Sequence, residues 1–252
     1  MPFLWVLLIF LFCKLTSATE YKLHVESFPV AVKEPSGLTY DPLHDTLWTV
    51  QDGGGIVYEI TKKGEVSGSI DLSSNDLEGI AYRPDTQTFL LAEERKREIV
   101  EIDRKGKVLK TIKVPISYHL WNMNYGIEGV SLDPKSGNIF VVNEKKPKMV
   151  MELKEDGTVL NSFEVKDADD LSDIYYDATT GNLLVLSHES RKVMEFTRKG
   201  KLVSSFSIEA SKAEGITRDA SGFLYIICEK GQKLYIYSPL GQKATSAPRR
   251  TR

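Results

Sequence analysis

The chain alternates between short apolar runs and polar turns, and this pattern repeats five times. Each repeat opens with a serine or glutamate, a glycine or aspartate, and then an aliphatic residue; the blocks occupy 35–42, 77–84, 127–134, 171–178 and 213–220. The aligned glycine or aspartate positions are 42, 50, 44 and 42 residues apart. A period of about 40 to 50 residues is typical of one blade of a β-propeller.

Each block is followed by further stretches with the pattern of a strand. A near-continuous apolar run comes first, as in 89–92 and 139–142, and indicates a strand buried on both faces. An alternating run follows and ends at a glycine turn, and in four repeats a last run such as 108–114 completes the unit. Short strands and turns at even spacing predict an all-β fold. We therefore predict a five-bladed β-propeller of four-stranded antiparallel blades, with the propeller domain spanning 19–241.

The fifth repeat lacks a fourth strand, because a polar tail follows Gly241, and we expect residues 242–252 to be disordered. Residues 21–25 alternate in the manner of a fourth strand and precede the first block. We predict that this N-terminal strand pairs with the last blade and closes the ring, which leaves only short, protected edges. The alternative is a six-bladed ring with one degenerate blade, although no residues remain to build it.

The N-terminus carries an unbroken apolar run at 3–12, followed by small residues at 16–18. This pattern predicts a signal peptide cleaved after Ala18, although no basic residue precedes the run. The run is short for a membrane span, which needs about 20 residues. The alternative is an uncleaved membrane anchor over 1–18, so that the protein associates with the membrane through its N-terminus. In both cases we expect an exported protein, periplasmic or attached to the cell membrane, with the propeller outside the cytoplasm.

Carboxylates recur at two places in the repeats. In an antiparallel blade, the start of the first strand and the end of the second lie at the same end, so these side chains should meet at one mouth of the central channel. Clustered carboxylates repel one another, and some pKa values rise unless a cation lies among them. Their oxygens suit calcium, and suit magnesium less well because it demands stricter geometry. The alternative is a network of caps and ion pairs. The candidate metal ligands are Asp52, Glu78, Glu94, Glu128, Glu144, Glu214 and Glu229.

Two further features should share this mouth. Basic residues follow the second strands, where they either form a collar that attracts an anionic ligand or pair with nearby acids. An aromatic insertion at 118–125 either forms a lid over a ligand or packs on a blade. In the fourth repeat a histidine replaces the acid at the end of the second strand. The candidate ligand-binding residues are His119, Trp121, Tyr125, His188, Arg95 and Lys145.

The net charge of −2 and the pI of about 6.1 argue against a dedicated nucleic-acid binder, which would be strongly basic. The sequence contains no serine-hydrolase elbow, no His-Glu-x-x-His motif and no phosphate-binding loop. We expect a monomer whose unknown ligand is an anionic small molecule, a glycan or a protein. If the N-terminal segment is removed, Cys228 is the one remaining cysteine and no internal disulfide forms.

The chain resembles the SdiA-regulated, or YjiK-like, family over about residues 21–237. This resemblance implies a propeller, an envelope location and a suspected central metal site, but no known activity. Ser36, Ser172 and His188 depart from the acidic pattern and leave the ring of acids incomplete. The blocks that carry the resemblance are 78–80, 171–174, 213–216 and 224–229.

The sequence thus favours a non-enzymatic binding or scaffold protein of the cell envelope, with a calcium-like cation at the mouth of the channel. Similar blocks also occur in phytase-like and gluconolactonase-like propellers. The alternative is therefore a metal-dependent hydrolase of a phosphoester or lactone, in which Glu78, Glu128 and Glu214 would hold the metal. The fold alone does not choose between them, since propellers have many unrelated functions.

Overall fold

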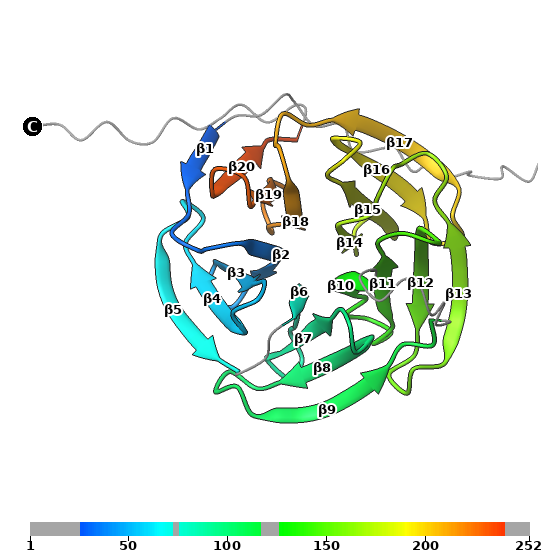
Figure 1. The fold of residues 1–252 in the computed structure, drawn as a ribbon, viewed down its shortest axis with the longest axis horizontal. Coiled ribbons are helices and arrows are strands. Elements are labelled where there is room, and N and C mark those ends of the chain that lie inside the picture. Colours follow the sequence, from blue (N-terminus) through cyan, green and yellow to red (C-terminus); the bar gives the residue numbers. More distant parts are fainter. Residues whose placement is uncertain (1–25, 73–75, 117–125, 240–252) are drawn as a thin grey trace, which may run out of the picture.

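The structure, a computed structural model, describes residues 26–72, 76–116 and 126–239. Its strands form five four-stranded antiparallel sheets, arranged around a central axis like the blades of a propeller (Figure 1). The described part of the chain is all-β and contains no helix long and apolar enough to span a membrane. The prediction of five blades is confirmed.

Each blade is built mainly from strands that are consecutive in sequence, because tight turns let neighbouring strands pair antiparallel. Blade 1 contains β2 (Pro35–Asp41), β3 (Thr46–Gln51), β4 (Ile56–Ile60) and β5 (Val66–Asp71). Blade 2 contains β6 (Leu77–Arg83), β7 (Thr88–Glu93), β8 (Glu98–Ile102) and β9 (Val108–Lys113). Blade 3 contains β10 (Ile127–Leu132), β11 (Ile139–Asn143), β12 (Met149–Leu153) and β13 (Val159–Glu164). Blade 4 contains β14 (Asp173–Asp177), β15 (Asn182–Ser187), β16 (Lys192–Thr197) and β17 (Leu202–Ser207).

Blade 5 combines the two ends of the described chain and closes the ring. It contains β18 (Ala213–Arg218), β19 (Leu224–Cys228), β20 (Lys233–Tyr237) and the N-terminal strand β1 (Glu26–Pro29). β1 pairs antiparallel with β20, and Glu26 lies opposite Ile236. The predicted closure by an N-terminal strand is confirmed, but the strand is Glu26–Pro29. The segment expected for it, 21–25, lies outside the described residues, as do 1–18 and 242–252.

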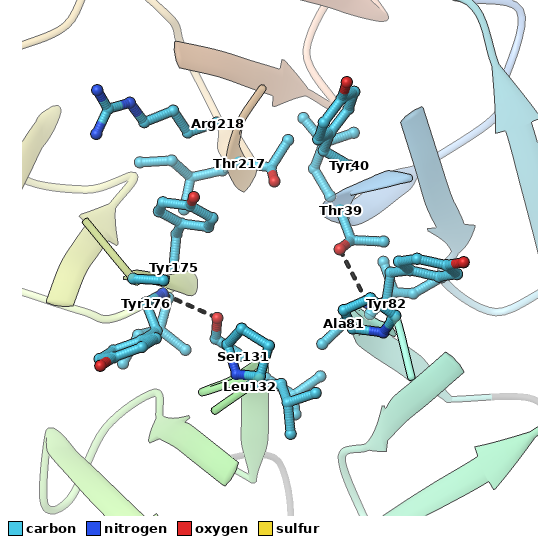
Figure 2. Close-up of a pocket in the computed structure, with 18 of the residues that line it drawn as sticks. Thr39, Tyr40, Ala81, Tyr82, Ser131, Leu132, Tyr175, Tyr176, Thr217 and Arg218 are labelled. Carbon is cyan, nitrogen blue, oxygen red and sulfur yellow. Dashed lines mark hydrogen bonds between the residues drawn. The ribbon is translucent and has the colours of Figure 1, made fainter. Parts of the chain in front are cut away.

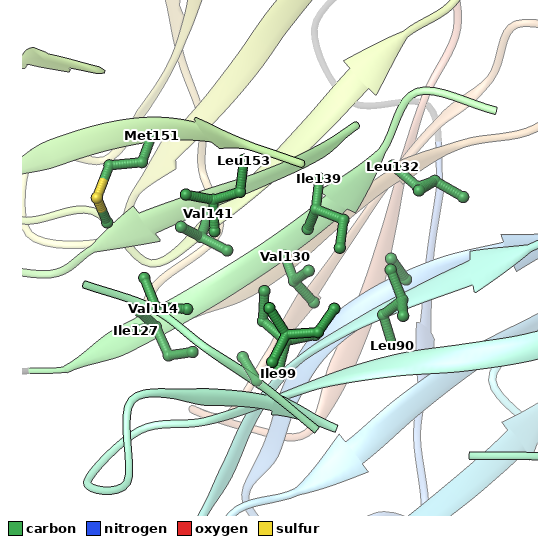
Figure 3. Packing of buried hydrophobic residues seen from close by; sticks show 13 residues of the cluster. Leu90, Ile99, Val114, Ile127, Val130, Leu132, Ile139, Val141, Met151 and Leu153 are labelled. Carbon is green, nitrogen blue, oxygen red and sulfur yellow. The ribbon is translucent and has the colours of Figure 1, made fainter. Parts of the chain in front are cut away.

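The hydrophobic core lies between neighbouring blades. All residues of β7 and β15 are buried, as their continuous apolar patterns predict. Between blades 2 and 3, Leu90 and Ile99 pack with Ile139 and Val141 (Figure 3). Burying side chains of this size stabilises a fold by roughly 1.5–3 kcal/mol each, so each blade is stabilised by its neighbours. Burial also raises the pKa of the Cys228 thiol to about 12, which keeps it protonated within this core.

Near the axis, the first strands of the blades approach one another closely. Four blades have glycine at the aligned position, and a Cβ added to Gly129 would lie 2.6 Å from the Cα of Asp173 in the next blade. Blade 4 has Asp173 there, and its carboxylate accepts 2.8 Å hydrogen bonds from the N–H groups of Ile174 and Ile216. This side chain thus satisfies backbone donors at the axis. One cavity is lined by first-strand residues that precede the aligned position and by residues that follow the second strands. A second cavity is lined by first-strand residues that follow the aligned position.

Candidate metal centre

The first cavity has a volume of about 230 Å³ and is lined mainly by carboxylates. First strands begin and second strands end here: Ile127, which opens β10, pairs with Asn143, which ends β11. Glu128 and Glu144 are therefore neighbours at this end of blade 3. All seven acids proposed as metal ligands from the sequence line this cavity, together with His188. We call it the acidic mouth: Asp52, Glu78, Glu94, Glu128, Glu144, Glu214 and Glu229.

Three of these acids form a compact cluster. One carboxylate oxygen from each of Glu94, Glu128 and Glu144 lies within 4.8 Å of the other two. Glu94 also accepts a 3.0 Å hydrogen bond from the N–H of Gly126, and Glu144 forms a 3.2 Å ion pair with Lys145. Glu128 has neither a hydrogen bond nor an ion pair with any residue that the structure describes.

Burial and mutual repulsion raise the pKa values of this cluster. Burial, followed by the charge of Glu78, holds the pKa of Glu128 well above its ordinary value. Burial and then the charge of Asp76 raise the pKa of Glu94 to about 7, and burial also raises the pKa of Glu144. A cation among these side chains would favour their ionised forms and displace the protons.

A second acidic group lies on the side of blades 1 and 2, where Asp52, Asp76 and Glu78 offer oxygens within 4.8 Å of one another. Burial, followed by the charge of Asp52, raises the pKa of Glu78 to about 9. Asp76 was missed from the sequence, although it stands two residues before the acid of the first strand. Three of the other four blades also place polar residues at this position, and blade 3 has Gly126, so aligning it would have given a further signal. The polar residues are Glu34, Asp170 and Lys212.

Blade 4 departs from the acidic pattern and carries its own ion pair. Nδ1 of His188 lies 2.7 Å from Oδ2 of Asp170, 3.2 Å from Oγ of Ser172 and 3.6 Å from Oε1 of Glu214. Hydrogen bonds to Asp170 and Glu214 raise the pKa of His188 to about 10. Burial opposes ionisation of Asp170, but hydrogen bonds from His188 and Ser187 outweigh it and lower the Asp170 pKa. This raised pKa favours the imidazolium form of His188 at neutral pH. Asp170, His188 and Glu189 also offer ligand atoms within 4.8 Å of one another, so they form a third group that could hold a metal ion.

Removing this imidazolium should destabilise the protein. We expect His188→Ala to lower the free energy of unfolding by roughly 3 kcal/mol, because it leaves the fully buried Asp170 without a charged partner. His44→Ala is the matched control, since His44 lies 2.8 Å from a buried acid, Asp41, that also pairs with Arg104. Urea unfolding should show a much smaller loss for His44→Ala. Equal losses in the two variants would contradict the role assigned to His188.

Positive charge is distributed unevenly around the acidic mouth. On the side of blades 4 and 5, Lys212 pairs with Glu229, and His188 lies beside Glu214. On the side of blades 2 and 3, the carboxylate of Glu128 faces other acids. The acids on the side of blades 4 and 5 therefore lie beside positive groups of the protein, whereas Glu128 on the other side lies among carboxylates.

The basic loops at the mouth are engaged by acids. Nε of Arg95 lies 3.3 Å from Oδ1 of Asp76, and Nζ of Lys145 lies 2.7 Å from Oε1 of Glu189. The ion-pair interpretation of these loops therefore describes both residues. The other proposed ligand-binding residues lie outside the described part of the chain: His119, Trp121 and Tyr125.

Five blades around a carboxylate-lined channel end define the class of this protein as a five-bladed β-propeller with an acidic mouth. The family model described as SdiA-regulated matches residues 14–236, which is most of the chain. The chain therefore belongs to the SdiA-regulated family.

Solved structures share the fold at low sequence identity. The chain is similar to a streptogramin B lyase, with 16% identity, a TM-score of 0.54, and coverage of 85% of this chain and 71% of the lyase. It is also similar to virginiamycin B lyase from Staphylococcus aureus, with 17% identity and a TM-score of 0.52, covering 81% of this chain but only 66% of the lyase. At such identities the likeness shows the propeller fold alone.

Proposed function

We propose that this SdiA-regulated propeller is a binding or scaffold protein of the cell envelope that holds a divalent cation, calcium before magnesium, in its acidic mouth. The protein ligands are Glu94, Glu128 and Glu144. The observation that carries the proposal is the convergence of three carboxylate oxygens within 4.8 Å, one of them from Glu128, which has no other partner among the described residues.

The elements that hold these side chains support the proposal. Glu128 lies on β10, and Glu94 and Glu144 directly follow β7 and β11, so buried strands position all three. Calcium takes about six to eight oxygens in irregular geometry, and magnesium requires a near-ideal octahedron. Three glutamates occupy only part of a calcium coordination sphere. The remaining positions suit oxygens of a bound ligand, and an anionic ligand would match the charge of the cation.

The same position would also suit metal-assisted hydrolysis of a phosphoester or lactone. Glu94 is the residue that favours this second candidate, because it stands in the cluster with Glu128 and Glu144, and in the ionised form, which a cation would favour, it can act as a general base. The imidazolium of His188 offers no base. Calcium-dependent turnover that is lost in Glu94→Gln would favour the hydrolase, whereas calcium binding without turnover would favour the binding protein.

The envelope location rests on the apolar run at 3–12, which has the pattern of a signal peptide or membrane anchor. We infer that the propeller lies outside the cytoplasm. Resistance of the propeller to protease added outside intact inner membranes would contradict this location.

Calcium should stabilise the folded protein. Residues 19–252 include every described strand, among them β1, which closes the ring. After EDTA treatment, adding calcium should raise the midpoint of thermal unfolding, because a ligand that binds only the folded state stabilises it. At 100 times the Kd the gain is about 2.7 kcal/mol, or roughly 5–10 °C for a protein of this size. Glu128→Gln should remove the rise.

Glu229→Gln is the matched control, because it makes the same change of charge at an acid of the mouth that already pairs with Lys212. This variant should retain the rise. The cation site would be rejected if neither calcium nor magnesium shifted the midpoint, or if Glu128→Gln kept the full calcium response. The acids would then be interpreted as an ion-paired rim.

A further inference from the structure

A second cavity, of about 180 Å³, lies at the other end of the channel (Figure 2). We call it the axial pocket. Its lining includes one buried aliphatic residue from each blade, the residue directly after the aligned glycine or aspartate, and we call these five residues the aliphatic base. These residues are Leu38, Ile80, Val130, Ile174 and Ile216.

Tyrosines stand around this aliphatic base and are fixed by packing behind them. The ring of Tyr82 lies 5.6 Å from that of Phe89, and the ring of Tyr176 stacks on Phe140 at 5.0 Å between centroids. In Figure 2 these two rings point away from the centre of the pocket, whereas the ring of Tyr175 stands beside it. The pocket is therefore a mostly apolar hollow with one aromatic ring at its wall, which suits a ring-shaped ligand.

Hydroxyl groups from blades 1, 3 and 5 provide polar contacts in the pocket. Oγ1 of Thr39 accepts a 3.0 Å hydrogen bond from the N–H of Tyr82, and Oγ of Ser131 accepts one of 2.9 Å from the N–H of Tyr176 (Figure 2). Both hydroxyls act as acceptors in these bonds, so their hydrogens remain as donors. Neither donates to any residue that the structure describes.

Thr217 carries the third hydroxyl of this set, and this hydroxyl does not accept a hydrogen bond from a backbone N–H of the described residues. Its residue is only 2% exposed, it lines the pocket, and its side chain has no hydrogen-bond partner in the described part of the chain. The hydroxyl oxygen is not fully buried, so it opens to the pocket, where a ligand acceptor would receive its hydrogen bond. This side chain therefore points to a ligand with an oxygen acceptor.

The charge and the size of the axial pocket restrict the class of ligand further. Arg218 is the charged residue that lines the pocket, and its Nη1 pairs with Oδ2 of Asp177 at 2.7 Å. The described lining therefore offers no uncompensated charge to a ligand. A cavity of about 150 Å³ is large enough for benzene, so this pocket accommodates a single substituted ring.

We propose that the axial pocket binds a small uncharged ring compound that carries a carbonyl or similar oxygen acceptor. The ring lies on the aliphatic base beside Tyr175, and the oxygen accepts a hydrogen bond from Thr217. This site is separate from the acidic mouth and needs no cation.

Titration of residues 19–252 with three probe compounds, carried out in EDTA, tests the proposal. The methyl NMR signals of Ile80 and Ile216 report the binding. Acetophenone has a ring and one carbonyl, ethylbenzene has similar size without an acceptor, and benzoate carries a charge. We expect saturable binding, tightest for acetophenone and weakest for benzoate. Absence of saturable acetophenone binding, or tighter binding of benzoate, would overturn the proposal.

Variants of Thr217 test the polar contact. Thr217→Val keeps the shape and should weaken acetophenone binding roughly two- to tenfold, with ethylbenzene unchanged, while Thr217→Ser should restore the acetophenone affinity. Thr111→Val, on the exposed outer strand β9, is the control and should change neither. Equal affinity of wild type and Thr217→Val for acetophenone would overturn the assigned contact. Glu128→Gln should leave acetophenone binding intact, so that failure here is distinct from failure of the cation site.

Discussion

Gly37→Ala is expected to remove much of the stability of the propeller, whereas Gly53→Ala should leave it folded. Both glycines have positive φ, 58° and 67°, so alanine strains the backbone at either position by roughly 1–2 kcal/mol. A Cβ on Gly37 would lie 2.8 Å from the Cα of Gly79 and 2.9 Å from the carbonyl oxygen of Glu78, whereas a Cβ on Gly53 meets nothing within 4 Å. Those neighbours are backbone of the next blade, so they yield only if two first strands move apart.

Thermal unfolding, monitored by circular dichroism, distinguishes the cost of backbone strain from the cost of the steric clash at the axis. We expect Gly37→Ala to lose more than about 4 kcal/mol, an unusually large effect for one substitution, and its midpoint to fall by at least roughly 10 °C. Gly53→Ala reports the backbone strain alone. Similar midpoints for the two variants would show that the contact at the axis is loose and that the ring tolerates a side chain at this position.

Without a bound cation, the protein should lose stability as the pH rises from 5 to 9. Burial raises the pKa of Glu78 to about 9 and that of Glu94 to about 7, and it holds the pKa of Glu128 well above its ordinary value. In the unfolded chain a glutamate titrates near pH 4.3, so above that pH the folded protein binds more protons than the unfolded chain. The free energy of unfolding therefore falls as pH rises, until these groups are ionised in both states.

His188 acts in the same direction, because its folded-state pKa of about 10 exceeds its ordinary value near 6.5. We expect the midpoint of unfolding in EDTA to fall by roughly 10 °C between pH 5 and pH 9, or about 3–5 kcal/mol. Glu128→Gln retains His188 and should reduce the fall, so it isolates the contribution of the carboxylates. A midpoint that stays constant or rises over this range would contradict the raised pKa values.

Calcium should flatten this pH dependence. A cation takes the place of the protons among the carboxylates, so the stabilisation by calcium should increase with pH as fewer protons compete. Glu229→Gln should behave like the wild-type protein because that acid is paired with Lys212. An equal stabilisation by calcium at pH 5 and pH 9 would indicate that the bound ion does not contact the cluster around Glu128.

The two ends of the channel have different chemistry, although the same strands form both. The acidic mouth lies before the aligned position of each first strand, and the axial pocket lies after it. Close contact at that position, as between Gly129 and Asp173, lies between the two sites. Binding of a cation at one end and of a neutral ring compound at the other can therefore be tested independently.

The number and type of blades were predictable from the sequence because each blade is a local antiparallel sheet. The turns, the apolar runs such as 89–92 and the repeat spacing act within about 45 residues, so no long-range information was needed. The closing strand was predictable in kind, since the last repeat lacked its fourth strand. The structure pairs Glu26–Pro29 with β20, and the predicted segment 21–25 lies outside the described residues.

The candidate metal ligands were also readable from the sequence, since a repeated position reaches the same end of every blade. Their charge state was not. It depends on burial and on distances between blades, such as the 2.7 Å contact of His188 with Asp170, which the pattern of residues does not encode. The uneven charge of the mouth, with Glu128 unpaired and Glu229 neutralised, therefore emerged only from the packed ring.

The sequence by itself determined the all-β repeat, the five blades and the gathering of acids at one mouth, because these follow from local strand and turn patterns. Only the tertiary structure decided which acids share a cation-sized space and which already have a partner. It also revealed the axial pocket, whose threonines, tyrosines and isoleucines are ordinary core residues in the sequence. A cavity exists there because five strand edges meet around an axis, and the unpaired hydroxyl of Thr217 becomes apparent only once they do.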